Sequence, residues 1–195
     1  MSMLGSKKKL AMTDLDGTLV NTLAVNYESY RQALEEAGYP LSLETYERDC
    51  FGRTYRDFLP ELMPGADSDA MQRVHDRKIQ LYAGLLDRLQ LNEHLCAMLD
   101  GLRETYILAL VTTASAVNTR RVLRHFHLED FFDAVFTQED MKCPKPAPDC
   151  YLDVMAQFGI GPQDAVIFED SPSGLASAKG SGCTVFSMAG WGEKA

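Results

Sequence analysis

Short apolar runs alternate with helical segments along most of the chain, and this alternation constrains the fold more than any other feature. The runs predicted as strands are residues 9–13, 106–111, 133–137, 165–169 and 183–187. Strands joined through helices are typical of a parallel sheet that is covered by helices on both faces. The sequence therefore predicts an α/β fold with a doubly wound parallel sheet.

One block interrupts this alternation directly after the first strand. Residues 23–88 show helical patterns and no convincing strand. In the first segment, apolar or aromatic residues at positions 25, 27, 30, 34 and 37 share one helix face, and the glycine and proline at 38 and 40 end it. We predict that residues 23–88 form an inserted helical subdomain and that residues 1–22 and 89–195 form the α/β core.

Charge and composition restrict the partners. The net charge of −9 argues against a nucleic-acid backbone or an anionic membrane, because both attract basic patches. No apolar run approaches the roughly 20 residues of a membrane span or the length of a signal peptide. The five cysteines form no CxxC pair, which indicates a reducing compartment. We predict a cytoplasmic protein, a monomer or weak dimer, that binds neither nucleic acid nor membrane.

Polar side chains follow four of the predicted strands. They are Asp14 and Asp16, then Thr112, Thr113 and Ser115, then Lys145, and finally Glu169, Asp170 and Ser171. Ligands bind beyond the carboxyl ends of the strands in an open parallel sheet, so we expect one shared site. Clustered carboxylates repel unless a cation joins them, and Mg²⁺ favours a few carboxylates with waters and phosphate. A lysine and hydroxyls suit a phosphoryl group. The residues predict a site for Mg²⁺ and a phosphorylated ligand.

These residues also form four motifs whose order resembles the haloacid dehalogenase superfamily, in its Mg²⁺-dependent phosphatase and phosphomutase branch. The motifs are "DLDGT" at 14–18, the Thr112 that ends "LALVT", Lys145 in "PKPAPD", and the acidic pair in "FEDSPSG" at 168–174. The resemblance spans nearly the whole chain. It implies a Rossmann-like core with a helical cap inserted after the first strand, and we call residues 23–88 the cap.

The resemblance implies a catalytic role for each motif. Asp14 resembles the nucleophile, which attacks phosphorus and becomes a transient aspartyl phosphate. Asp16 resembles the general acid and base, which protonates the leaving alcohol and then activates water. Thr112 and the amides after it, including that of Thr113, resemble the phosphate clamp. Lys145 resembles the charge that screens the nucleophile from the phosphate.

The resemblance also implies the ligands of the metal. Asp170, together with Asp14 and the main-chain oxygen of Asp16, resembles the Mg²⁺ shell. Glu169 is either a further metal ligand or a residue that hydrogen-bonds to the ligands, and the sequence leaves both roles open.

The cap is expected to supply substrate specificity, because the core recognises only the phosphoryl group. Its polar candidates are Arg53, Thr54 and Arg56 in "FGRTYRD", which resembles the substrate-facing loop of related helical caps. The alternative for each arginine is the solvated basic start of a helix.

We therefore predict a Mg²⁺-dependent phosphatase of a small phosphorylated metabolite. One alternative is a sugar phosphomutase of the same fold. The β-phosphoglucomutase relatives carry a hinge histidine twelve residues after the nucleophile, where this chain has Asn26, which carries no proton near neutral pH. A second alternative is a regulatory protein that binds a phosphate ligand without catalysis, and the intact carboxylates at 14, 16 and 170 argue against it.

Overall fold

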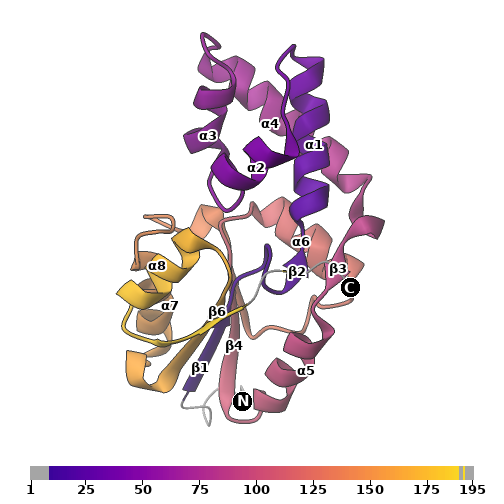
Figure 1. Ribbon diagram of the computed structural model, residues 1–195. Coiled ribbons are helices and arrows are strands. Elements are labelled where there is room, and N and C mark those ends of the chain that lie inside the picture. The colour runs from indigo at the N-terminus through magenta and orange to yellow at the C-terminus, as the bar shows by residue number, and fades with distance from the viewer. Residues whose placement is uncertain (1–8, 189–190, 192–195) are drawn as a thin grey trace. The chain divides into compact units, whose positions relative to one another are not determined.

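A computed structural model describes residues 9–188 and residue 191 (Figure 1). The chain divides into two compact units, one made of Met1–Asn21 and Leu91–Ala195 and the other of Thr22–Gln90. The borders predicted from the sequence, after residues 22 and 88, differ from these by one and two residues. The first unit is the core and the second is the cap.

The core is built on a five-stranded sheet with the order β5-β4-β1-β6-β7. Its strands are β1 (Lys9–Thr13), β4 (Tyr106–Val111), β5 (Ala134–Phe136), β6 (Ala165–Glu169) and β7 (Thr184–Ser187). Every pairing is parallel, and Leu10 of the central strand lies opposite Ile107 on one side and Ala165 on the other. The predicted α/β fold with a parallel sheet is confirmed.

Helices cover both faces of this sheet. They are α5 (Glu93–Leu102), α6 (Ala116–His125), α7 (Asp149–Phe158) and α8 (Pro172–Gly180), with short 3₁₀ turns at Gln138–Asp140 and Pro162–Asp164. Figure 1 shows α7 and α8 on one face, and α5 and α6 on the other. Successive strand residues point to opposite faces, so Leu10 and Met12, which are two residues apart, lie on the same face of the sheet. Both belong to the buried cluster that includes Tyr151 and Val154 of α7.

The order of the strands fixes where a ligand site can form. From β1 the chain moves outward through β4 to β5, and it then returns to the other side of β1 to form β6 and β7. The direction of winding therefore reverses between β1 and β6. Ligands of such sheets bind at the carboxyl ends of the strands beside this reversal. Asp14 follows β1 there, and Asp170 follows β6.

The cap consists of four α-helices followed by a 3₁₀ turn. They are α1 (Leu23–Glu36), α2 (Leu43–Asp49), α3 (Tyr55–Leu62), α4 (Ser68–Ala83) and η2 (Leu86–Arg88). Two helices start with a side-chain cap, because Ser42 accepts from the Thr45 amide and Asp67 from the Ala70 amide. Two strands of two residues each, β2 (Val20–Asn21) and β3 (Gln90–Leu91), pair with each other and were not predicted from the sequence.

Aromatic side chains dominate the interior of the cap. The rings of Tyr30 and Phe58 meet edge to face with centroids 5.1 Å apart, and Tyr55 stacks on His75 at 3.7 Å. Such pairs add packing energy beyond the area they bury. None of the helices in the described ranges is both long enough and apolar enough to cross a membrane.

Candidate active site

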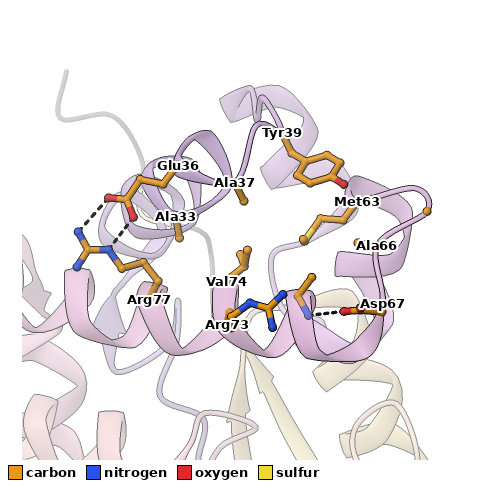
Figure 2. A pocket seen from close by; sticks show the side chains of 12 residues that line it. Ala33, Glu36, Ala37, Tyr39, Met63, Ala66, Asp67, Arg73, Val74 and Arg77 are labelled. Carbon is orange, nitrogen blue, oxygen red and sulfur yellow. Dashed lines mark hydrogen bonds and ion pairs between the residues drawn. The ribbon is translucent and has the colours of Figure 1, made fainter.

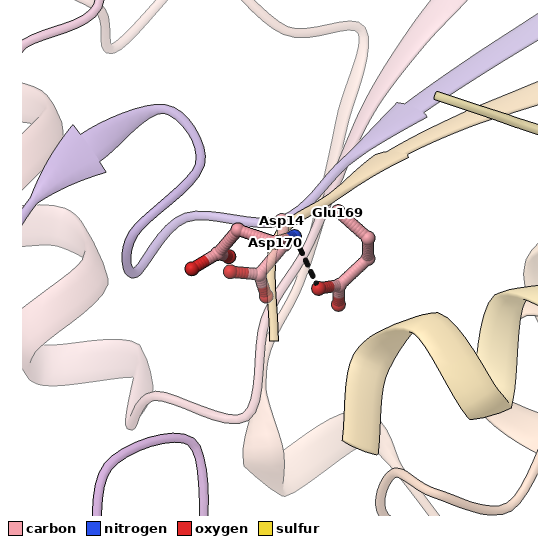
Figure 3. A group of neighbouring side chains, drawn as sticks. All are labelled: Asp14, Glu169 and Asp170. Carbon is pink, nitrogen blue, oxygen red and sulfur yellow. Dashed lines mark hydrogen bonds between the residues drawn. The ribbon is translucent and has the colours of Figure 1, made fainter. Parts of the chain in front are cut away.

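Three carboxylates gather at the carboxyl ends of β1 and β6. Asp14, Glu169 and Asp170 each offer an oxygen within 4.8 Å of the other two (Figure 3). The pairing of the strands brings them together, because the Asp14 amide donates to the Phe168 carbonyl at 3.0 Å. Asp14 and Glu169 are buried, and Asp170 is half-buried.

Lys145 neutralises part of this negative charge. Its ammonium group is buried and donates to Asp14 Oδ1 at 2.7 Å, to Glu169 Oε1 at 2.6 Å and to the Val111 carbonyl at 3.0 Å. The lysine reaches the cluster from the loop that precedes α7, so three segments meet at one nitrogen. A buried ammonium group with several partners is held at one position, which suits a residue that fixes the geometry of Asp14.

Glu169 is fully buried, and both of its oxygens are engaged. Oε1 accepts from Lys145 and from the Tyr151 hydroxyl at 3.0 Å, and Oε2 accepts from the amides of Asp170 at 3.0 Å and Ser171 at 3.3 Å. A Cβ at Gly174, in the first turn of α8, would lie 1.9 Å from Oε1. Glycine at this position therefore leaves the space that the carboxylate occupies.

Asp170 is held by the turn that follows β1. The Thr18 hydroxyl donates to Asp170 Oδ1 at 2.7 Å. Gly17 adopts a φ of +89°, and a Cβ there would lie 2.2 Å from Asp170 Oδ2. Glycine is thus required both by the backbone conformation and by the close approach of the carboxylate. Sequence reasoning gave Thr18 no role, although it belongs to the "DLDGT" motif.

The surroundings shift the pKa values of these groups. Burial raises the pKa of Asp14 well above its usual range, against the opposing charge of Lys145. Burial also raises the pKa of Asp170 to about 6, although the Thr18 hydrogen bond acts the other way. Burial would lower the pKa of Lys145, but Asp14, Tyr151 and Glu169 outweigh it and raise that pKa above its ordinary value. The site therefore has more buried negative charge than Lys145 alone compensates.

Asp16 and the two threonines lie on neighbouring loops of the same unit. Asp16 is half-buried, and its carboxylate is not among the three that cluster. Thr112 is fully buried at the end of β4, where its amide donates to the Phe136 carbonyl and its hydroxyl accepts from the Ala114 amide. Thr113 is half-buried in the turn that leads to α6.

The predicted cap residues belong to the other unit. Arg53 is engaged within the cap, since it donates to Glu61 Oε1 at 2.8 Å and to the carbonyls of Asp49 and Asp57. The Arg56 guanidinium lies 4.7 Å over the Tyr55 ring and is exposed. Arg53 thus joins the end of α2 to α3, while Arg56 stands at the surface.

A separate cavity of about 510 Å³ lies within the cap (Figure 2). It is bounded by the end of α1, the segment between α3 and α4, and α4 itself. An ion pair between Arg77 and Glu36 at 2.7 Å lies on its wall, and Asp67 is engaged in capping α4. Its lining includes neither Arg53 nor Arg56. The arginines predicted to recognise substrate therefore do not line this cavity.

Known proteins are similar to this chain over most of its length. The model of the haloacid dehalogenase-like hydrolase family matches residues 11–188. A phosphorylated carbohydrates phosphatase of Thermotoga maritima is 33% identical over 175 residues, which cover 87% of this chain and 79% of that protein. The fructose-1-phosphate phosphatase YqaB of Escherichia coli is 26% identical, with coverage of 87% and 90%.

The fold is also similar to that of solved structures. The crystal structure of CbbY from Rhodobacter sphaeroides in complex with phosphate superposes with a TM-score of 0.84. Its sequence is 21% identical, and the match covers 94% of this chain and 87% of that one.

Proposed function

The chain belongs to the haloacid dehalogenase-like hydrolases, and from this premise we propose that it is a Mg²⁺-dependent phosphatase of small phosphorylated metabolites. The observation that carries the proposal is the buried Asp14, which is bonded to Lys145 and lies beside Asp170. Relatives named as phosphatases of phosphorylated carbohydrates, fructose 1-phosphate and phosphoglycolate support a small phosphate ester as the substrate.

The donor set fits a hard divalent cation. The hydrogen bonds from Lys145 and Thr18 engage Oδ1 of Asp14 and Oδ1 of Asp170, so within the described part of the chain Oδ2 of each carboxylate is open to a cation. We propose that these two residues and the main-chain oxygen of Asp16 hold Mg²⁺, which prefers such oxygen ligands. Bound there, the ion would offset the clustered negative charge and attract the phosphoryl oxygens.

Glu169 is better suited to support the site than to ligate the metal. Each of its oxygens already accepts at least two hydrogen bonds, from Lys145 and Tyr151 on one side and from two amides on the other. We propose that Glu169 positions Lys145 and the peptide of Asp170. The sequence left both roles open, and the hydrogen bonds of Glu169 support this one.

The proposed reaction has two steps. In the first, a carboxylate oxygen of Asp14 attacks phosphorus, the bond from phosphorus to the substrate oxygen breaks, and Asp16 gives a proton to the leaving alcohol. In the second, a water molecule attacks the aspartyl phosphate while Asp16 takes its proton, so that inorganic phosphate leaves and Asp14 is restored. Lys145, whose Nζ lies 2.7 Å from Asp14 Oδ1, favours the ionised form of Asp14 and opposes the rise in pKa that burial causes.

The phosphoryl group needs hydrogen-bond donors around its other oxygens. We propose that Lys145, the Thr112 hydroxyl and the amide of Thr113 supply them from the loops after β4 and β5. The Ala114 amide already donates to Thr112 Oγ1 at 3.1 Å, so the hydroxyl proton of Thr112 can point elsewhere. Substrate specificity is proposed to come from the cap, with Arg53 and Arg56 as the candidates.

The basic test is hydrolysis of p-nitrophenyl phosphate with Mg²⁺ and with EDTA. We expect turnover with Mg²⁺ that is abolished by EDTA and restored when Mg²⁺ is returned. Full activity in EDTA would contradict the proposed role of the metal. Metal binding without turnover of any ester would instead favour a non-catalytic regulator.

A second assay distinguishes the phosphatase from a phosphomutase. β-Glucose 1-phosphate is supplied with a catalytic amount of the bisphosphate, and glucose 6-phosphate and inorganic phosphate are both followed. Asn26 lies in α1 and carries no ionisable group, so we expect the aspartyl phosphate to hydrolyse freely. Glucose 6-phosphate forming much faster than inorganic phosphate would overturn the phosphatase proposal.

A further inference from the structure

Two described residues beyond β7, Met188 and Trp191, contact the ends of the two segments that carry the clustered carboxylates. Ser187 lies opposite Glu169 in the parallel register, and the amide of Met188 donates to the Glu169 carbonyl at 2.7 Å. The indole Nε1 of Trp191 donates to the Gly17 carbonyl at 2.7 Å. Met188 thus contacts the end of β6, and Trp191 contacts the turn after β1.

The carbonyl that Trp191 holds is directly linked to the support of Asp170. It belongs to the peptide that joins Gly17 to Thr18, and the Thr18 hydroxyl donates to Asp170 Oδ1 at 2.7 Å. On the other side of Gly17, its amide donates to the Val20 carbonyl at 2.8 Å. Fixing this peptide therefore fixes the position from which Thr18 reaches the carboxylate.

We propose that Trp191 is a positioning residue of the metal site, whose indole N–H holds the Gly17–Thr18 peptide so that Thr18 orients Asp170. The inference rests on the proposed function, because it takes Asp170 as a metal ligand. The hydrogen bond of Trp191 goes to a main-chain carbonyl and not to a carboxylate. It acts through two hydrogen bonds in series, each 2.7 Å long.

A tryptophan could instead be present only for packing, since a partly buried indole N–H takes whichever acceptor is near. The two roles differ in what they protect. A packing residue maintains the folded state as a whole, whereas a positioning residue maintains the affinity for the metal. The decisive readout is therefore metal binding measured apart from turnover.

The first experiment compares Mn²⁺ binding by calorimetry in the wild type, Trp191→Phe, Phe186→Leu and Asp170→Asn. Trp191→Phe keeps an aromatic ring but removes the N–H. Phe186→Leu is the matched control, because Phe186 is an exposed aromatic side chain of the same terminal segment that stacks on Phe168. Asp170→Asn tests the metal site itself.

We expect Trp191→Phe to bind Mn²⁺ about 3- to 10-fold more weakly, the size of one hydrogen bond. The half-saturating Mg²⁺ concentration should rise by the same factor, while kcat at saturating Mg²⁺ stays within about twofold. Phe186→Leu should bind like the wild type. Unchanged binding in Trp191→Phe, or an equal loss in Phe186→Leu, would overturn the positioning role. Unchanged binding in Asp170→Asn would overturn the proposed metal site instead.

A second measurement needs no variant, because Trp191 is the only tryptophan in the chain. If it lies against the "DLDGT" turn, its fluorescence should be quenched by Mn²⁺ with the same midpoint as the calorimetric titration. An excess of Mg²⁺ should reverse the quenching. Emission that does not respond to Mn²⁺ at concentrations that fill the site would show that Trp191 is not held there, and would contradict the inference.

Discussion

The core and the cap bury different kinds of side chain. The core encloses a group of charges, in which the ammonium of Lys145 lies 2.7 Å from Asp14 and 2.6 Å from Glu169. The cap instead encloses aromatic rings, with Tyr30, Phe58 and their neighbours in mutual contact. Buried charges need partners in defined directions, whereas packed rings need mainly volume and shape. The core is therefore specified by exact residue types, and the cap by general hydrophobicity.

Two ion pairs of the cap illustrate this difference. The side chains that pair Arg77 with Glu36 and Arg53 with Glu61 are at least one-third exposed. Exposed pairs contribute little to stability and are easily exchanged. A cap of this kind can change its surface residues without losing its fold. Under the proposed mechanism, the core cannot change its charged cluster without losing activity.

The strongest test of the comparison is Asp14→Asn. The substitution keeps the shape of the side chain but removes the proposed nucleophile, so we expect kcat to fall by at least about a thousandfold. The fold should persist and can gain stability, because burial already raises the pKa of Asp14 and disfavours its charge. Activity on p-nitrophenyl phosphate and thermal unfolding are measured together.

The matched control for this variant is Asp153→Asn, an exposed aspartate on α7 of the same unit. It should leave both activity and the unfolding temperature unchanged. If Asp14→Asn retained more than a few per cent of the wild-type turnover, the assignment of the nucleophile would be wrong.

The next largest effect is expected for Asp170→Ala. Removing this carboxylate should raise the half-saturating Mg²⁺ concentration by about a hundredfold, and saturating Mg²⁺ should restore only part of the turnover. Ca²⁺ should compete for the same site and inhibit, because its larger and looser coordination shell misplaces the nucleophile. Titration of activity with each ion checks both points. Equal support of turnover by Ca²⁺ would contradict the proposed site.

The same contrast explains which parts of the fold could be predicted from the sequence. Strands β1, β4 and β6 have the predicted bounds, because each is an apolar run buried between neighbours. The edge strands β5 and β7 are shorter than their predicted ranges of 133–137 and 183–187, because each has a sheet neighbour on one side only. The two-residue strands β2 and β3 are too short to give a periodic signal.

The site was predictable to the extent that its residues belong to local motifs. The sequence predicted one shared site beyond the strands, and Asp14, Lys145 and Asp170 lie near one another in the core. Thr18 and Trp191 could not be recognised, because their partners lie 152 and 174 residues away in the chain. The role of Glu169 depends on how many donors surround it, which only the packing of α7 and α8 determines.

A pH titration tests whether the cap depends on its ring packing. His75 stacks on Tyr55, and its Nδ1 lies 3.0 Å from the Tyr30 hydroxyl. Burial lowers the pKa of His75 to about 4. The positive charges of Lys78 and Arg56 lower this pKa further, and the negative charge of Asp76 opposes them. Below its ordinary pKa of about 6.5, the unfolded chain binds a proton that the folded cap excludes. The contribution of His75 to stability should therefore be lost as the pH falls from about 6.5 to about 4, by at most about 3 kcal/mol, whereas Asp170, whose pKa is raised to about 6, contributes in the opposite sense over this range.

The measurement is urea unfolding of the full chain at several pH values, followed by the near-ultraviolet circular dichroism of the tyrosines. His75→Phe keeps a ring against Tyr55 and should remove this part of the pH dependence. His94→Gln, at an exposed position of α5 in the core, should leave it in place. Identical pH profiles for His75→Phe and the wild type would show that His75 is not the group that titrates.

The smallest expected effects concern the cap arginines. Arg56 is exposed and rests on the Tyr55 ring, so Arg56→Ala should leave the fold intact. If it faces substrate as proposed, kcat/KM should fall severalfold for sugar phosphates and stay nearly constant for p-nitrophenyl phosphate, whose small leaving group offers little to recognise. Arg53→Ala should change selectivity in the same sense.

Arg53→Ala should also lower the unfolding midpoint, because Arg53 bonds Glu61 and the carbonyls of Asp49 and Asp57. Arg48→Ala is the control for both variants, since Arg48 is an exposed cap arginine that pairs only with acids of its own helix. If all three variants treat every ester alike, the loop is not the specificity element. Because the packing of the cap depends mainly on the volume of its buried rings, an exposed cap residue can change selectivity without changing stability. The buried charged cluster of the core offers no exposed position of this kind.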